Sequence, residues 1–69
     1  MTFVEFQETI HASGYLIVCL NDYKREGAFY TFVAIQDKAG HGYHAEGRTD
    51  ALSDTLKELV AQMQKPKGE

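Results

Sequence analysis

The most strand-like segment of the chain reads Gly14-Tyr15-Leu16-Ile17-Val18-Cys19-Leu20. It is aromatic and β-branched, and turn-forming residues flank it on both sides, so it predicts a β-strand. Residues 28–35, Ala-Phe-Tyr-Thr-Phe-Val-Ala-Ile, predict a second strand by the same criteria. The polar residues 21–27 between them end in a glycine, as hairpin loops often do, and therefore predict the loop of a hairpin.

A short third strand is expected at residues 43–46, after the turn signal Asp37-Lys38-Ala39-Gly40. The connections between the three predicted strands are too short for parallel crossovers. The strands should therefore form an antiparallel meander.

Beyond Gly47 the apolar spacing changes to the helical period, which predicts an amphipathic helix of about four turns. Its apolar stripe consists of Leu52, Leu56, Leu59, Val60 and Met63. We expect Thr49 or Asp50 to cap the helix N-terminus and Pro66 to end the helix.

The first twelve residues support two interpretations. Phe3, Phe6 and Ile10 fit one face of a helix, and residues 2–5, Thr-Phe-Val-Glu, match a capping box. The same segment also alternates between apolar and polar residues, and its aromatic residues favour a strand. We favour a strand that bends near residues 12–14.

The sequence therefore predicts an α+β fold, with an antiparallel three- to four-stranded sheet packed on one C-terminal amphipathic helix. Sixty-nine residues make one small domain, which we place at residues 1–64, with a flexible tail at 65–69. Cys19 is the only cysteine, so no internal disulfide supports the domain, and nothing supplies a structural zinc cluster. We expect oligomerisation or a partner to provide the missing support.

Both faces of the central strands are apolar. In residues 28–35, one side carries Phe29, Val33 and Ile35 and the other carries Tyr30, Phe32 and Ala34. An antiparallel sheet with one solvated face alternates apolar and polar residues, and this one does not. Because one helix covers one face, we expect a partner protein or a second copy on the other, as a homodimer, unless the N-terminal segment folds across it.

Charge and hydropathy restrict the classes of partner. Ten acidic against seven basic residues give a net charge of −3, which disfavours binding to nucleic-acid phosphates. No apolar run approaches the roughly 18 residues of a membrane span, so we expect no membrane association. No basic region precedes a hydrophobic stretch at the N-terminus, and a free cysteine without disulfides fits a reducing cytosol. We expect a cytoplasmic protein.

The sequence predicts no catalytic site, no metal and no cofactor. His41 and His44 are three residues apart, and such side chains point to opposite faces of a strand. No cysteine or close carboxylate completes a tetrahedral set of ligands. Cys19 lies among aliphatic residues and should be a buried thiol that packs as a small hydrophobe. Asp54 and Glu58 share a helix face, which is typical of a solvated surface.

Residues 27–59 resemble the antitoxin half of HicB-type modules. There a strand, a turn with Asp and Gly, a second strand ending near Gly-x-Thr, and a helix follow one another. Here these elements read as residues 29–34, Asp37-Lys38-Ala39-Gly40, Gly47-Arg48-Thr49 and Asp50 onward. The resemblance implies an antitoxin that binds a small basic RNase toxin and covers its active-site histidine.

The chain is also similar to a family of small phage anti-CRISPR proteins that blocks a type I-F CRISPR surveillance complex. The residues that carry this similarity are Met1, Phe3, Thr9, His11 and Ile17, with Val4 and Phe6 as conservative replacements. Phe6 stands where the family has a surface tyrosine that binds the complex, whereas Leu20 replaces another of its aromatic residues. The resemblance implies a protein-binding inhibitor.

Both resemblances imply a compact, acidic, non-catalytic protein that occupies the surface of another protein. We therefore expect a phage-encoded inhibitor of a bacterial defence complex, acting in the host cytoplasm on a larger protein or nucleoprotein complex, with the HicB-like antitoxin as the alternative. Exposed tyrosines suit interface cores, and an acidic rim suits a basic partner. The partner-binding residues we predict are Phe6, Tyr15, Tyr23, Glu26, Tyr43 and Glu46.

Overall fold

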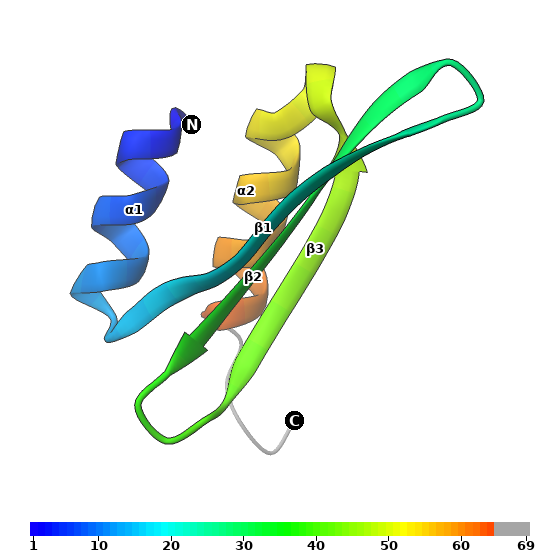
Figure 1. The fold of residues 1–69 in the computed structure, drawn as a ribbon. Coiled ribbons are helices and arrows are strands. Elements are labelled where there is room, and N and C mark those ends of the chain that lie inside the picture. The colour runs from blue at the N-terminus through cyan, green and yellow to red at the C-terminus, as the bar shows by residue number, and fades with distance from the viewer. Residues whose placement is uncertain (65–69) are drawn as a thin grey trace.

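A computed structural model describes residues 1–64 of the chain. Its elements are α1 (Phe3–Ala12), β1 (Tyr15–Arg25), β2 (Ala28–Asp37), β3 (Gly42–Arg48), a 3₁₀ turn η1 (Thr49–Ala51) and α2 (Leu52–Met63). The strands form one antiparallel sheet in the order β1-β2-β3 (Figure 1). The predicted α+β class, the three-stranded meander and the C-terminal helix are confirmed. The predicted tail at 65–69 and the predicted stop at Pro66 lie outside the described residues.

Residues 3–12 form a helix, so the N-terminal strand that we favoured is wrong. The capping box is present: the Glu5 backbone N–H donates to Thr2 Oγ1 at 3.1 Å, and the Thr2 N–H donates to Glu5 Oε1 at 2.8 Å. Phe6 and Ile10, one turn apart, are both fully buried. Helical spacing therefore buries both large side chains on one stripe, while the box satisfies N–H groups that the first turn leaves free.

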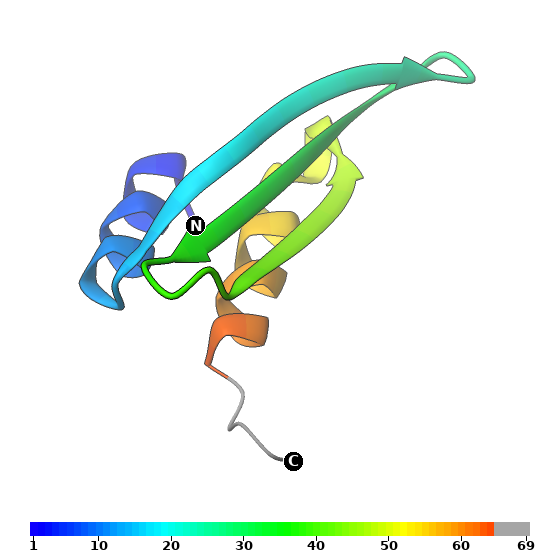
Figure 2. The same cartoon turned by 60° about the horizontal axis from the view of Figure 1, so that its bottom comes forward.

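Two helices cover the sheet, in place of the single one predicted. Both lie on the same side of it (Figure 2). Their apolar stripes join the inward residues of β2 in one core, which contains Phe6, Ile10, Tyr15, Val33, Ile35, Ala45, Leu56, Leu59 and Val60. We call the covered side the helix face and the opposite side the outer face.

The hairpin between β1 and β2 has a shorter loop and longer strands than predicted. Residues 21–25, expected in a loop, continue β1 and pair with residues 28–32 of β2. Only Glu26 and Gly27 form the turn, and both have positive φ, 50° and 82°. This is the backbone of a type I′ turn, whose twist matches that of the flanking strands. The hairpin end forms an arm that projects beyond the helices (Figure 1), and the arm is two-stranded only at residues 24–29, because residues 30–32 of β2 also pair with β3.

A β-bulge at Val18 changes which side chains of β1 face the helices. Ile17 pairs with buried Ile35, whereas Cys19, two residues on, pairs with Ala34. The extra residue therefore turns Cys19 to the outer face, where its side chain is half-buried and not fully buried as predicted. Leu20 returns to the helix face opposite Val33.

The start of α2 differs from the prediction in its cap. Leu56, Leu59 and Val60 are buried as predicted, and Leu52 and Met63 pack against them. The N-cap is Ala51, and no side chain caps the helix. The Thr49 hydroxyl instead bonds to the Thr31 hydroxyl at 2.8 Å, and Asp50 pairs with Arg48 at 3.1 Å, because the turn η1 places both residues ahead of the helix.

Candidate protein-binding face

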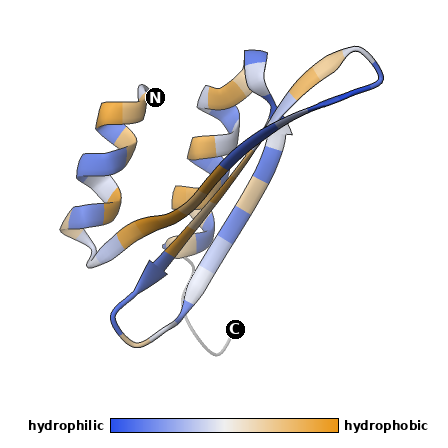
Figure 3. Ribbon diagram, viewed as in Figure 1, coloured by the Kyte–Doolittle hydropathy of each residue, from blue (hydrophilic) through white to orange (hydrophobic). Residues whose placement is uncertain are grey.

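No helix or strand of residues 1–64 covers the outer face of the sheet (Figures 1 and 2). Strand alternation and the pairing register define its residues, because Thr31, Val33 and Ile35 of β2 are buried toward the helices and their neighbours point away. The outer face comprises Leu16, Cys19, Asn21, Tyr23, Arg25, Ala28, Tyr30, Phe32, Ala34, Gln36, His44, Glu46 and Arg48. Figure 3 shows that the first half of β1 and much of β2 are hydrophobic, whereas the second half of β1 is hydrophilic and β3 is mostly polar.

Two ring stacks cross the middle of the outer face. The Tyr23 and Tyr30 rings lie 5.5 Å apart and 11° from parallel, joining β1 to β2. The Phe32 ring lies 5.5 Å from the His44 ring, joining β2 to β3. Cross-strand ring pairs of this kind hold side chains in fixed positions on a sheet. The face therefore presents a preorganised aromatic surface.

Glu46 fixes the polar end of this surface. A hydrogen bond from the Tyr23 hydroxyl to the Glu46 carboxylate raises the pKa of Tyr23, and burial and the negative charge of Glu46 act in the same direction. The phenol therefore stays protonated at physiological pH and acts as the hydrogen-bond donor toward Glu46. In a partner interface this pair would supply one oriented carboxylate beside an aromatic ring.

The other end of the surface is aliphatic. Leu16 is 60% exposed, and Val18, at the bulge, is 57% exposed. Both line a shallow groove of about 440 Å³ at the β1 edge, together with Gln36. Large aliphatic side chains grouped with aromatic ones on an uncovered face are a recognised mark of an interaction surface.

Of the six predicted partner-binding residues, Tyr23 and Glu46 lie together on the outer face. Glu26 is exposed at the tip of the hairpin. The remaining three lie on the helix side: Phe6 and Tyr15 are buried, so their prediction as exposed residues is wrong, and Tyr43 is half-buried. Phe6 is fully buried because α1 is a helix that turns it into the core. Tyr15 and Tyr43 share the helix face with Ile35, and their rings lie 6.1 Å apart.

Tyr15 is buried in the core, so little of its side chain is available for contact with a partner. Only 9% of the residue is exposed, and desolvation raises the pKa of its hydroxyl, with smaller contributions from Tyr43 and Asp37. Tyr43 is half-buried beside it. The two tyrosines therefore lie at the end of the core that is next to the β2–β3 turn.

The prediction did not include Tyr30, Phe32, Leu16 and His44, which also lie on the outer face. The sequence did contain evidence for Leu16, Tyr30 and Phe32, because both faces of the central strands are apolar. The pairing that places His44 beside Phe32 depends on the β2–β3 register, in which Ala34 and His44 are opposite each other. That register cannot be read from a four-residue strand prediction.

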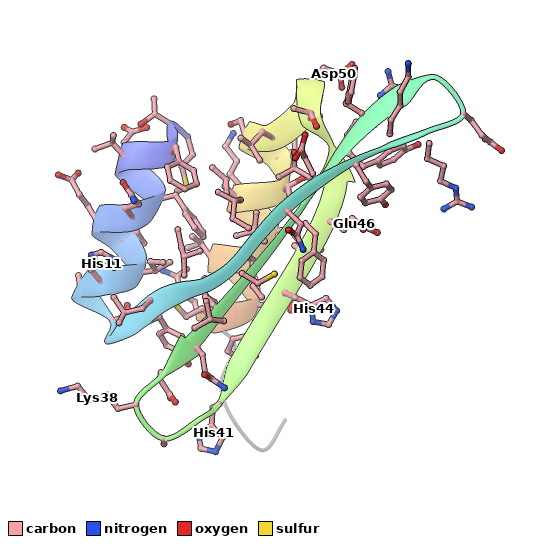
Figure 4. All side chains as sticks on the ribbon, in the orientation of Figure 1. His11, Lys38, His41, His44, Glu46 and Asp50 are labelled. Carbon is pink, nitrogen blue, oxygen red and sulfur yellow. The ribbon has the colours of Figure 1, made fainter. Side chains whose placement is uncertain are left out.

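No group of three His, Cys, Asp or Glu side chains in residues 1–64 is close enough to hold a metal ion. His41 lies in the β2–β3 turn with its Nδ1 3.7 Å from Asp37 Oδ2, whereas His44 lies on the outer face, and Figure 4 shows the two rings apart. Within the same residues, no helix is long and apolar enough to cross a membrane.

Comparison with known proteins identifies no relative. No family model matches the chain, and no curated protein or solved structure is significantly similar to it. The function must therefore be argued from the site.

Proposed function

We propose that this protein is a non-catalytic inhibitor that binds another protein through the outer face of its sheet. The observation that carries the proposal is a sheet with both helices on one side and an aromatic, aliphatic surface on the other. An open face of this composition is costly to leave in water, and protein interfaces are enriched in the same residue types.

Several features favour a protein partner over a nucleic acid. The chain has a net charge of −3. Arg48 on the outer face pairs with Asp50 at 3.1 Å, and the Lys24 ammonium on the helix face lies 5.6 Å from the centre of the Phe29 ring. Among residues 1–64, this leaves Arg25 as an isolated exposed cation on the outer face. Binding to phosphates requires clustered, available cations.

The distribution of acidic residues favours a target that handles nucleic acid. Glu5 and Glu8 on α1 and Asp54 and Glu58 on α2 are exposed on the side away from the outer face. A chain docked by its sheet would display these carboxylates outward. They would repel nucleic acid from the surface beside them, and the net charge would speed association with a basic groove.

These properties suit the target class implied by the sequence resemblance, and we propose that the chain is a phage-encoded inhibitor of a bacterial CRISPR surveillance complex, acting in the host cytoplasm. The test uses the purified type I-F complex immobilised for a binding assay, followed by a gel-shift assay with its target DNA. We expect stoichiometric binding of the chain and loss of DNA binding by the complex.

Absence of binding to the complex would contradict this target. The HicB-like antitoxin is the second candidate, because β2, the turn, β3 and α2 follow one another in the order of that module. It predicts binding to a small basic RNase toxin and protection of the toxin's RNA substrate. Assaying both targets with the same preparation separates the two candidates.

A further inference from the structure

The arm formed by β1 and β2 has an open edge. The sheet order is β1-β2-β3, so residues 21–25 of β1 have β2 on one side and no strand of residues 1–64 on the other. We call these five residues, Asn-Asp-Tyr-Lys-Arg, the arm edge. An open strand edge is a template for pairing with another strand.

Side chains along the arm edge alternate between the two faces of the sheet. Asp22 and Lys24 lie on the helix face, opposite Thr31 and Phe29, whereas Tyr23 between them lies on the outer face opposite Tyr30. Both charged side chains are exposed, and neither makes an ion pair within residues 1–64. The edge therefore presents Asp22 and Lys24 symmetrically about Tyr23, with Arg25 as a second base at its outer end.

We propose that the arm edge pairs with the arm edge of a second copy of this chain, as antiparallel strands related by a two-fold axis at Tyr23. This register places Asp22 opposite the partner's Lys24, and Lys24 opposite the partner's Asp22. Tyr23 meets the partner's Tyr23 on the outer face, and Asn21 meets the partner's Arg25. Each opposed pair shares one face, as antiparallel pairing requires, and the symmetry forms two ion pairs at once.

A second copy fits this edge because the sequence is complementary to its own reverse. Asn-Asp-Tyr-Lys-Arg read against itself puts opposite charges together and no like charges together. An unrelated strand would need the same spacing of base, aromatic residue and acid. The two unpaired charges are thus explained by one partner, this chain.

Other edges are less suited to a second copy. The first half of β1, residues 15–20, runs beside α1 (Figures 1 and 2), and a second molecule paired there would bring its own α1 into the same space. At the opposite edge, α2 reaches β3, where Gln62 Nε2 donates to the His44 carbonyl at 3.2 Å. The outer part of the arm, residues 24–29, projects past both helices (Figure 1), so this end of the arm edge is the part of β1 most open to a second strand.

Five residue pairs make a small interface, so association should be weak, dependent on concentration and weakened by salt. We would measure it by sedimentation equilibrium of the purified chain, from about 10 μM to about 1 mM at low ionic strength. The wild type should form dimers across this range. Asp22→Lys and Lys24→Asp should each raise the dissociation constant by roughly tenfold or more, because like charges then face each other.

Combining the two charge reversals should restore dimerisation. An equimolar mixture of the two single variants should form a heterodimer, and the double variant Asp22→Lys/Lys24→Asp should dimerise as the wild type does. A monomeric wild type, single variants that dimerise normally, or a mixture that stays monomeric would each overturn the proposal. Circular dichroism should show all variants folded, since both side chains are exposed.

This experiment uses the chain alone. Its failure would leave the proposed binding of a target protein untouched, and loss of target binding would leave the dimer untouched.

Discussion

At Gly47 the third strand approaches α2 so closely that a side chain has no room. A Cβ atom placed there would lie 2.5 Å from Thr55 Oγ1, far inside van der Waals contact. Gly47→Ala should therefore lower the free energy of unfolding by about 1–3 kcal/mol, the usual cost of overpacking. Urea unfolding followed by circular dichroism measures the change.

The contact with Thr55 supplies its own control. Within residues 1–64, the other atom close to that Cβ is Thr55 Cβ at 3.8 Å, an ordinary contact, so Thr55→Ala would remove the clashing atom. Gly47→Ala should cost much less in a Thr55→Ala background than in the wild type, giving a coupling energy of about 1 kcal/mol or more. Equal costs in both backgrounds would show that the clash is relieved elsewhere.

At the scale of elements, the capping box gives α1 a dependence on pH. Hydrogen bonding to the Thr2 backbone N–H, with help from the Thr2 side chain, lowers the pKa of Glu5 from its ordinary value of 4.5. The unfolded chain thus binds this proton more tightly than the folded one. The stability contributed by the carboxylate is complete above pH 4.5 and is lost as the pH falls through the lowered pKa.

Glu5→Gln tests this dependence, because the amide oxygen still accepts a hydrogen bond but does not titrate. Melting temperatures between about pH 6 and about pH 3 should fall more steeply for the wild type than for the variant. A carboxyl carbon NMR titration of Glu5 should give a midpoint below 4.5. A midpoint at or above that value would show that the box does not hold the charged form.

The hairpin turn carries strain at one residue. Glu26 has φ of 50°, a conformation that costs most side chains about 1–2 kcal/mol and that asparagine adopts more readily. Glu26→Asn should therefore stabilise the protein by about 0.5–1 kcal/mol, and Glu26→Val should destabilise it. Thermal unfolding of the two variants compares them. An unchanged melting temperature in both would mean that the arm unfolds separately from the core.

The elements that the sequence predicted correctly are those with long, regular apolar patterns. The stripe from Leu52 to Met63 and the runs at 14–20 and 28–35 have one consistent period each. Residues 2–12 fit two periods, and the choice between them depended on whether Phe6 and Ile10 could reach a common core. Burial against α2 decided that choice, and no local propensity contains this information.

The same limit explains the outcome for the candidate site. Apolar residues on both strand faces showed that one sheet face lacks a cover. The bulge at Val18 and the β2–β3 register decide which side chains share that face, and both arise from tertiary pairing. Tyr23 and Glu46 were predicted separately and lie together, whereas Phe32 was not predicted and lies at the centre.

The two faces of the molecule differ in structure and in composition. Its helices close one face of the sheet and carry acidic residues to solvent, and its strands leave the other face open, with aromatic rings stacked across it. Extents of 38 × 22 × 21 Å leave little room for an enclosed substrate site. This shape suits a protein that acts by covering part of a larger one.

Two phenylalanines of β2 distinguish binding through the outer face from binding through the helix face. Phe32 stacks on His44 at the centre of the outer face, and Phe29 is 56% exposed opposite Lys24 on the helix face. The measurement is the dissociation constant of each alanine variant for the immobilised surveillance complex, with folding checked by circular dichroism. Phe32→Ala should weaken binding by about fivefold or more, a loss of about 1 kcal/mol, while Phe29→Ala should bind like the wild type. Normal binding by a folded Phe32→Ala chain, or a larger loss in Phe29→Ala, would contradict a docking surface on the outer face.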